Sequence, residues 1–291
     1  MYGKLMYIFV FYLEGDMFMN ETSLESKEIF ESTKNALGEA SRDEIISDKA
    51  TTTVKLPSNG LISPDVTQVT LKRMSVLQAK TLYSSLDANY LSSLIKGCII
   101  DPVNITLNDL HPNDIIYLAF VLRHISSPKN VIQKVRCSEC GKIYDATVKV
   151  PELKVNFYDP TDKSFNVTLP DTGDRIHFKV LSEGELQHCE KIAQRKNRQA
   201  NVSEDEAAWE LLISKLCYMI ESKNDEPFED FEAKRKYLLS LSAYDFQTFN
   251  KAYSDIGESF GLDRKFVSEC TSCNASNEDE AIIPPDFFRL V

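Results

Sequence analysis

Two cysteine pairs with the same spacing constrain the fold of this 291-residue chain more than any other feature. The first pair is Cys137 and Cys140, and the second is Cys270 and Cys273. Two residues separate the cysteines of each pair, which lets one tight turn present two thiolates to a tetrahedral Zn2+. Four sulfur ligands leave no open coordination position, so such a site is structural and not catalytic. The sequence therefore predicts one structural zinc site with all four cysteines as ligands.

The residues around each pair support this prediction. Gly141 and Asn274 follow the second cysteine of each pair. A metal-binding turn needs a left-handed backbone at that position, which glycine adopts without strain and asparagine tolerates. Nearby basic side chains are expected to offset the negative charge of four thiolates around Zn2+: Arg136, Lys142, Arg264 and Lys265.

Other roles for the cysteines are less consistent with the sequence. Seven cysteines in 291 residues are sparse for a disulfide-stabilised secreted domain. A redox pair should open a helix after a strand, whereas the strand-like segment 143–150 follows Cys140. Four unrelated thiols remain an alternative. The other cysteines lie in apolar or helical contexts and are interpreted as core thiols: Cys98, Cys189 and Cys217.

The separation of the two pairs is unusual, because 129 residues lie between Cys140 and Cys270. A β-prone segment follows each pair, at 143–150 and at 281–283, which is typical of a zinc ribbon. The rest of the fold must bring the two halves of this ribbon together. A metal ion that closes so long a loop removes much chain entropy from the unfolded state.

The sequence predicts an α+β protein with a small N-terminal β-hairpin plus helices, a zinc-ribbon-like β unit, and a helical insertion between the two cysteine pairs. Residues 1–50 are expected to be a mobile tail or to include a non-native start, and residues 51–129 the N-terminal hairpin and helices. Residues 130–291 are expected to form the split ribbon unit. The insertion is placed at about 182–260, since Ser182 and Glu185 match a capping box at the start of a helical series.

Composition and motifs argue against several function classes. The net charge of −11 and pI near 5.0 do not suit a nucleic-acid surface. The nine-residue apolar run 5–13 is shorter than the roughly 20 residues that a membrane-spanning helix needs, so no membrane contact is predicted. The sequence contains no phosphate-binding glycine loop and no HExxH or GxSxG motif. We therefore expect no catalytic residues.

Several short motifs occur in an order that resembles the baseplate hub proteins of T-even-type, contractile-tailed bacteriophages. The resemblance covers about Val54 to Val291 and rests on these segments: Leu56–Leu61 (LPSNGL), Val69–Met74, the two cysteine pairs and Pro285–Arg289. It implies a non-enzymatic, zinc-stabilised interaction protein whose partners are other phage baseplate and tail proteins. It also implies action in the host cytoplasm during tail assembly, with retention in the virion left open.

Two questions about partners remain open at the level of sequence. The adjacent Phe287, Phe288 and Arg289 suit an aromatic anchor for a partner's groove, or the two rings pack back onto this chain's own ribbon. The helical insertion is a second candidate contact surface. The alternative function is a zinc-ribbon regulator that binds transcription machinery, which a basic stripe on the ribbon would favour.

Overall fold

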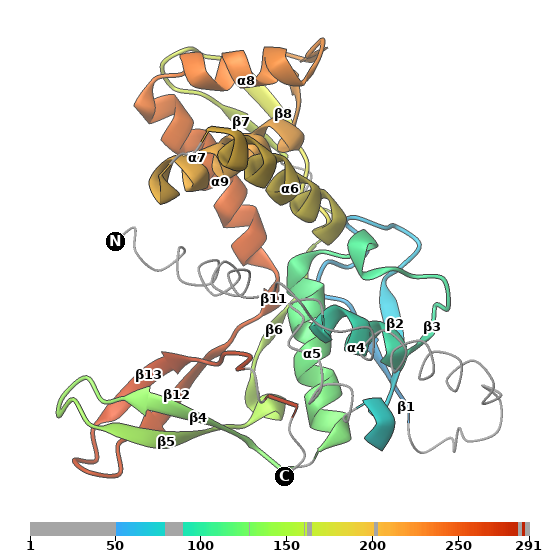
Figure 1. Ribbon diagram of the computed structural model, residues 1–291, viewed down its shortest axis with the longest axis vertical. Coiled ribbons are helices and arrows are strands. Elements are labelled where there is room, and N and C mark those ends of the chain that lie inside the picture. Colours follow the sequence, from blue (N-terminus) through green and yellow to red (C-terminus); the bar gives the residue numbers. More distant parts are fainter. Residues whose placement is uncertain are drawn as a thin grey trace.

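The computed structural model describes residues 51–78, 90–127, 129–159, 161, 165–200, 203–284 and 287–288. The tail predicted at residues 1–50 lies outside the described residues. The fold is α+β, as predicted, with a small N-terminal sheet and helices, a pair of β-hairpins that carry the cysteines, and a helical insertion (Figure 1). In Figure 1 the insertion is at the top and the two hairpins are at the lower left.

The N-terminal part packs a three-stranded antiparallel sheet and two helices around one apolar cluster. The elements are β1 (Thr51–Lys55), β2 (Gln68–Lys72), β3 (Ile99–Asp101), α4 (Tyr90–Cys98), the 3-10 helix η2 (Leu107–Asp109) and α5 (Pro112–Ser126). The turn after β1 is fixed to the start of α5, because the backbone N–H of Ser58 donates to the buried carboxylate of Asp114 at 2.9 Å. The LPSNGL segment, one of those that carry the family resemblance, is therefore attached to this core.

A two-stranded neck closes the long excursion between the cysteine pairs. Strand β6 (Val155–Asn156) follows the first cysteine hairpin and pairs antiparallel with β11 (Gly261–Leu262), on the returning chain. The backbone N–H of Asp263 also donates to the carbonyl oxygen of Lys154 at 2.8 Å. Because the insertion leaves and returns at one place, its length does not separate the two halves of the ribbon.

The insertion has its own sheet and its own apolar cluster. Its strands are β7 (Asn166–Thr168), β8 (Arg175–Phe178), β9 (Ile220–Lys223) and β10 (Glu226–Pro227), and its helices are α6 (Glu183–Ala200), α7 (Glu204–Met219), α8 (Phe231–Ser240) and α9 (Ala243–Ser259). The predicted capping box is present, since Ser182 N donates to Glu185 at 3.0 Å and Glu185 N donates to Ser182 Oγ at 3.3 Å. The apolar cluster includes Phe165 and Leu169, which lie before the predicted start of the insertion at about 182.

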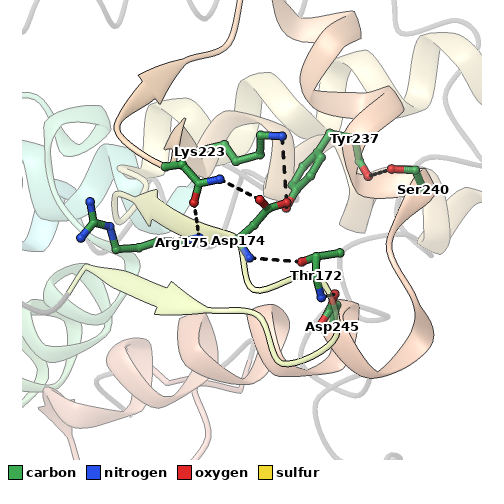
Figure 2. Close-up of polar contacts among 8 residues, drawn as sticks. Thr172, Asp174, Arg175, Lys223, Tyr237, Ser240 and Asp245 are labelled. Atoms are coloured by element: carbon green, nitrogen blue, oxygen red, sulfur yellow. Dashed lines mark hydrogen bonds and ion pairs between the residues drawn. The ribbon is translucent and has the colours of Figure 1, made fainter.

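A polar network joins the turns of this sheet to helix α8 (Figure 2). The carboxylate of Asp174, at the end of the β7–β8 turn, accepts hydrogen bonds from Tyr237 Oη at 2.8 Å and from Asn224 Nδ2 at 2.7 Å. The ammonium group of Lys223 lies 5.2 Å from the centroid of the Tyr237 ring. All of these residues belong to the insertion and hold its sheet to its own helix, so we assign the network a structural role.

The insertion is attached to the start of α5 by polar and aromatic contacts. The side chain of Asn113 donates to the carbonyl oxygens of Gly257 and Phe260, both at 2.8 Å, at the end of α9. Consecutive aromatic rings, with centroids 4.8 to 6.2 Å apart, connect α5 to the centre of the insertion: His111, Phe260, Tyr158, Phe165, Phe178 and Phe249. A continuous series of ring contacts thereby links the start of α5 to the apolar cluster of the insertion.

The buried His111 at this junction is expected to make stability depend on pH. Burial lowers the pKa of its imidazole from 6.5 to about 3. As pH falls below 6.5 the unfolded chain binds a proton that the folded chain does not, so stability falls with pH between these values. We expect this residue to lower the free energy of unfolding by about 2 kcal/mol between pH 7 and pH 5, since each pH unit in this range contributes at most about 1.4 kcal/mol.

Urea unfolding of wild type and His111→Asn at the two pH values tests this expectation. Asparagine keeps a side-chain acceptor for the helix N-terminus. Between pH 7 and pH 5, the free energy of unfolding of the variant should fall by about 2 kcal/mol less than that of wild type. The buried Asp114 has a raised pKa and acts in the opposite direction, but it is present in both proteins. Equal losses in the two proteins would contradict the assignment to His111.

Candidate metal centre

Each cysteine pair lies on a tight turn between two antiparallel strands. The first turn joins β4 (Val131–Arg136) to β5 (Ile143–Val148), and the second joins β12 (Lys265–Glu269) to β13 (Ser276–Glu280). In the first turn Cys137 N donates to Lys142 O at 2.9 Å and Gly141 N donates to Cys137 O at 3.0 Å. The second turn repeats both bonds, at 2.9 and 2.8 Å, with these residues: Cys270, Ala275 and Asn274.

The backbone after each second cysteine is left-handed, as the sequence predicted. Gly141 has φ of 70° and Asn274 has φ of 58°. No atom lies within 4 Å of the position where a Cβ would stand on Gly141, so the backbone conformation, and not crowding, favours glycine there. The two turns therefore have equivalent local geometry although their sequences differ.

The two turns face each other and bring the four sulfur atoms together. All four Sγ atoms lie within 4.8 Å of one another. The distance between the sulfurs of Cys137 and Cys273 is 3.6 Å, and that between Cys140 and Cys270 is 3.7 Å. A tetrahedral zinc with Zn–S bonds of about 2.3 Å requires sulfurs about 3.8 Å apart. The contacts are far longer than the roughly 2.05 Å of a disulfide bond.

The donor set fits a structural metal ion. Within the described residues these four thiols form the group of cysteine, histidine or acidic side chains that is close enough to share an ion. Cys137 and Cys270 are buried, whereas Cys140 and Cys273 face the solvent. Four soft sulfur donors in tetrahedral arrangement suit Zn2+ and leave no position for a substrate or a water molecule.

Backbone amides prepare two of the thiols for ionisation. The pKa of the Cys137 thiol is lowered to about 6, chiefly by the backbone N–H of Cys140 and also by that of Glu139. In the second turn the N–H of Ser272 lies 3.4 Å from the sulfur of Cys270 and lowers its pKa. Thiolates are the metal-binding form of cysteine, so these amides favour binding.

A cation is needed for all four thiols to ionise together. The backbone N–H of Ala275 lowers the pKa of Cys273, but desolvation and hydrogen bonds to the other three sulfurs outweigh it and raise this pKa to about 12. Several thiolates in contact repel one another. A divalent cation at their centre removes that repulsion, which is the electrostatic reason for expecting an ion here.

Two polar side chains that the sequence analysis did not single out connect the hairpins. Asn277 of β13 accepts hydrogen bonds from Ser138 N at 2.8 Å and from Ser138 Oγ at 2.9 Å. Tyr144 of β5 shares a hydrogen bond of 2.7 Å with Ser268 of β12. Their role depends on pairing across more than a hundred residues, which no local pattern indicates.

The prediction that Arg264 and Lys265 offset the charge of the second cysteine pair is wrong. Arg264 and Lys265 stand at the far end of β12, roughly 17 Å along the strand from Cys270 at about 3.4 Å per residue. Arg264 forms an ion pair with Glu280, and Lys265 lies 3.9 Å from Glu278. Both cations therefore neutralise acidic residues of β13 instead of the cysteine cluster.

The predicted strand after the second cysteine pair is also displaced. Strand β13 is Ser276–Glu280, whereas the sequence favoured residues 281–283. The segment SNEDE has low β-propensity, and it is a strand because its five residues pair in register with β12.

The C-terminal phenylalanines lie in the N-terminal core, and Arg289 lies outside the described residues. Phe287 and Phe288 are each 3% exposed. The Phe287 ring packs edge-on against Phe120 of α5, with centroids 5.0 Å apart, and its carbonyl oxygen accepts a hydrogen bond from Arg123 Nε at 2.7 Å. The rings thus pack on their own chain, against α5 and in one apolar cluster with Val131 and Val148 at the base of the first hairpin, and are buried instead of displayed as a surface anchor.

A comparison with protein-family models identifies the family. The model described as T4 bacteriophage base plate protein matches residues 49–289. The chain belongs to this base plate protein family. The match begins just before β1 and includes both cysteine pairs, so it covers the whole described fold of the base plate protein. The resemblance to phage baseplate proteins that the sequence showed is thereby confirmed at the level of the family.

Two further comparisons found no match, one with curated proteins and one with solved structures. The family is one of phage baseplate components, which implies other phage tail proteins as partners. Among the described helices of the base plate protein, none is long and apolar enough to cross a membrane.

Proposed function

We propose that this base plate protein is a non-enzymatic hub subunit or tail-assembly protein of a contractile-tailed bacteriophage, stabilised by one structural Zn2+. The observation that carries the proposal is the family match over residues 49–289. In this proposal it acts through protein–protein contacts, in the host cytoplasm during assembly and then in the baseplate of the virion. The ligands of the zinc are Cys137, Cys140, Cys270 and Cys273.

In this proposal the zinc ion stabilises the ribbon by joining its two hairpins. Each of the two hairpins alone is a two-stranded sheet, which is marginally stable in water. One ion would join them at the tips, while the neck of β6 and β11 joins them near their base. A ribbon fixed at both ends gives a rigid scaffold for contacts with neighbouring subunits.

The helical insertion is the favoured contact surface. Between Ser203 and Glu258 it carries thirteen acidic and six basic residues. Trp209 of α7, the single tryptophan of the chain, is 46% exposed and packs on Phe246 of α9 with ring centroids 5.2 Å apart. Tyr244, in the first turn of α9, is 60% exposed. Exposed aromatic rings in an acidic surface suit a partner that presents arginine or lysine.

A Trp209→Ala, Tyr244→Ala double variant tests this surface. We expect it to bind zinc and fold like wild type, and to enter purified tails at least about 30-fold less well, because paired aromatic anchors typically contribute 2 kcal/mol or more. Val103→Ala is the control, since Val103 is 74% exposed but belongs to the N-terminal part. Normal incorporation of the folded double variant would exclude this contact surface.

The alternative function, a zinc-ribbon regulator that binds transcription machinery, gains no specific support. The outer face of β4 carries the exposed Lys134 and Arg136, but that of β12 and β13 carries Glu269, Glu278 and Glu280. These faces do not form a continuous basic stripe around the ribbon, as transcription-linked nucleic-acid contact would require.

Inactivation of the gene in its phage tests the proposed function. We expect no infectious tails, restoration by the wild-type chain supplied in trans, and this chain among the proteins of purified tails. Complete, infectious tails without the chain would contradict the proposal. Restored tails that lack the chain would favour an assembly factor over a subunit of the virion.

A further inference from the structure

One buried amide side chain contacts both halves of the split ribbon. Asn277 is 5% exposed and lies on β13, four residues after Cys273. Its Oδ1 accepts two hydrogen bonds from Ser138 in the first cysteine turn. Its Nδ2 lies 3.7 Å from the sulfur of Cys137 and 3.0 Å from the carbonyl oxygen of Ala275. The side chain thus lies on the strand after the second cysteine turn and contacts Cys137, a predicted metal ligand in the first turn.

The orientation of this amide is fixed by its partners. The backbone N–H of Ser138 can only donate, so it must face the oxygen of Asn277 and not the NH2 group. The NH2 group then points toward Cys137 and the carbonyl oxygen of Ala275. A flipped amide would place donor against donor at Ser138 and would leave the carbonyl oxygen of Ala275 facing another oxygen.

The equivalent position of the first hairpin makes a reciprocal contact. Tyr144 lies four residues after Cys140, as Asn277 does after Cys273. Its hydroxyl reaches across to Ser268 of the other hairpin, while its ring packs in the same apolar cluster as Cys137 and Cys270. The Tyr144 hydroxyl therefore joins the hairpins through Ser268 and not through a sulfur, and this makes it a matched comparison for the Asn277 amide.

We infer that Asn277 is a positioning residue of the metal centre, which locks the two cysteine turns together and donates an N–H to the Cys137 thiolate. This inference rests on the proposed zinc site. An N–H directed at a ligand thiolate delocalises its negative charge, and a ligand held by such a neighbour loses less freedom when the metal binds. Asn277 accordingly raises metal affinity as well as joining the hairpins.

Three variants separate these two roles. Asn277→Asp keeps an acceptor for Ser138 but replaces the N–H near Cys137 by a carboxylate oxygen. Asn277→Ala removes both contacts. Tyr144→Phe removes one bond between the hairpins and leaves the sulfurs untouched. Each purified chain is titrated with Co2+, followed by its thiolate-to-cobalt absorption, and with Zn2+ against a chelator of known affinity.

We expect Asn277→Asp and Asn277→Ala to weaken metal binding by about 10- to 100-fold, as lost outer-shell contacts typically do. Tyr144→Phe should stay within about 3-fold of wild type. Wild-type affinity in both Asn277 variants would overturn the inference, and so would an equal loss in Tyr144→Phe, which would reveal a merely structural bond. Failure of the wild-type chain to bind either metal would instead overturn the proposed zinc site.

Discussion

Replacing Cys140 with serine is expected to release the metal and to lower the free energy of unfolding by roughly 3 kcal/mol or more, since binding of a structural zinc is coupled to folding. Cys140 is exposed, so its replacement removes little apolar packing. The cost arises because the remaining three thiols no longer complete the tetrahedral site that joins the two hairpins.

Zinc content and urea unfolding of the Cys140→Ser protein give the two measurements. Ser272→Ala is the matched control, because Ser272 is exposed in the equivalent turn and only its backbone N–H contacts a sulfur. The control should keep its metal and its stability. A Cys140→Ser protein as stable as wild type would show that the ribbon does not depend on an ion.

Replacing Phe287 with alanine is expected to cost about 3–5 kcal/mol, the typical loss for a fully buried phenylalanine. Its ring lies between Phe120 and Phe288, with centroids 5.0 Å from each, in the same cluster as helix α5. Thermal or urea unfolding measures the loss. Val267→Ala serves as control, since Val267 is 68% exposed and surface changes typically stay within about 0.5 kcal/mol.

This variant also distinguishes the two roles considered for the C-terminal segment. A destabilised protein that still assembles into tails at permissive temperature assigns the phenylalanines to the core. Full stability combined with a block in tail assembly would restore the partner contact predicted from the sequence. The position of Arg123, whose guanidinium donates to the carbonyl oxygen of Phe287, supports the first outcome.

The parts of the fold that depend on local sequence could be predicted. The turn geometry at Gly141 and Asn274 follows from the conformations that these residues tolerate. The start of α6 follows from a capping box within four residues. In each case one segment of the chain contains both the pattern and the atoms that satisfy it.

Non-local pairing decided what could not be predicted. Strand β13 forms from a segment of low β-propensity because β12 supplies its partner. The contact of Asn277 with Ser138 joins residues 139 apart. The burial of Phe287 requires the chain to return from the ribbon to α5, which neither segment encodes alone.

The metal content of the purified wild-type chain tests the central claim most directly. One zinc ion per chain by elemental analysis, lost together in variants of either cysteine pair, is the expected result, because Cys137 and Cys140 share a single site with Cys270 and Cys273. A fully folded chain that contains no metal after purification without chelators would contradict it.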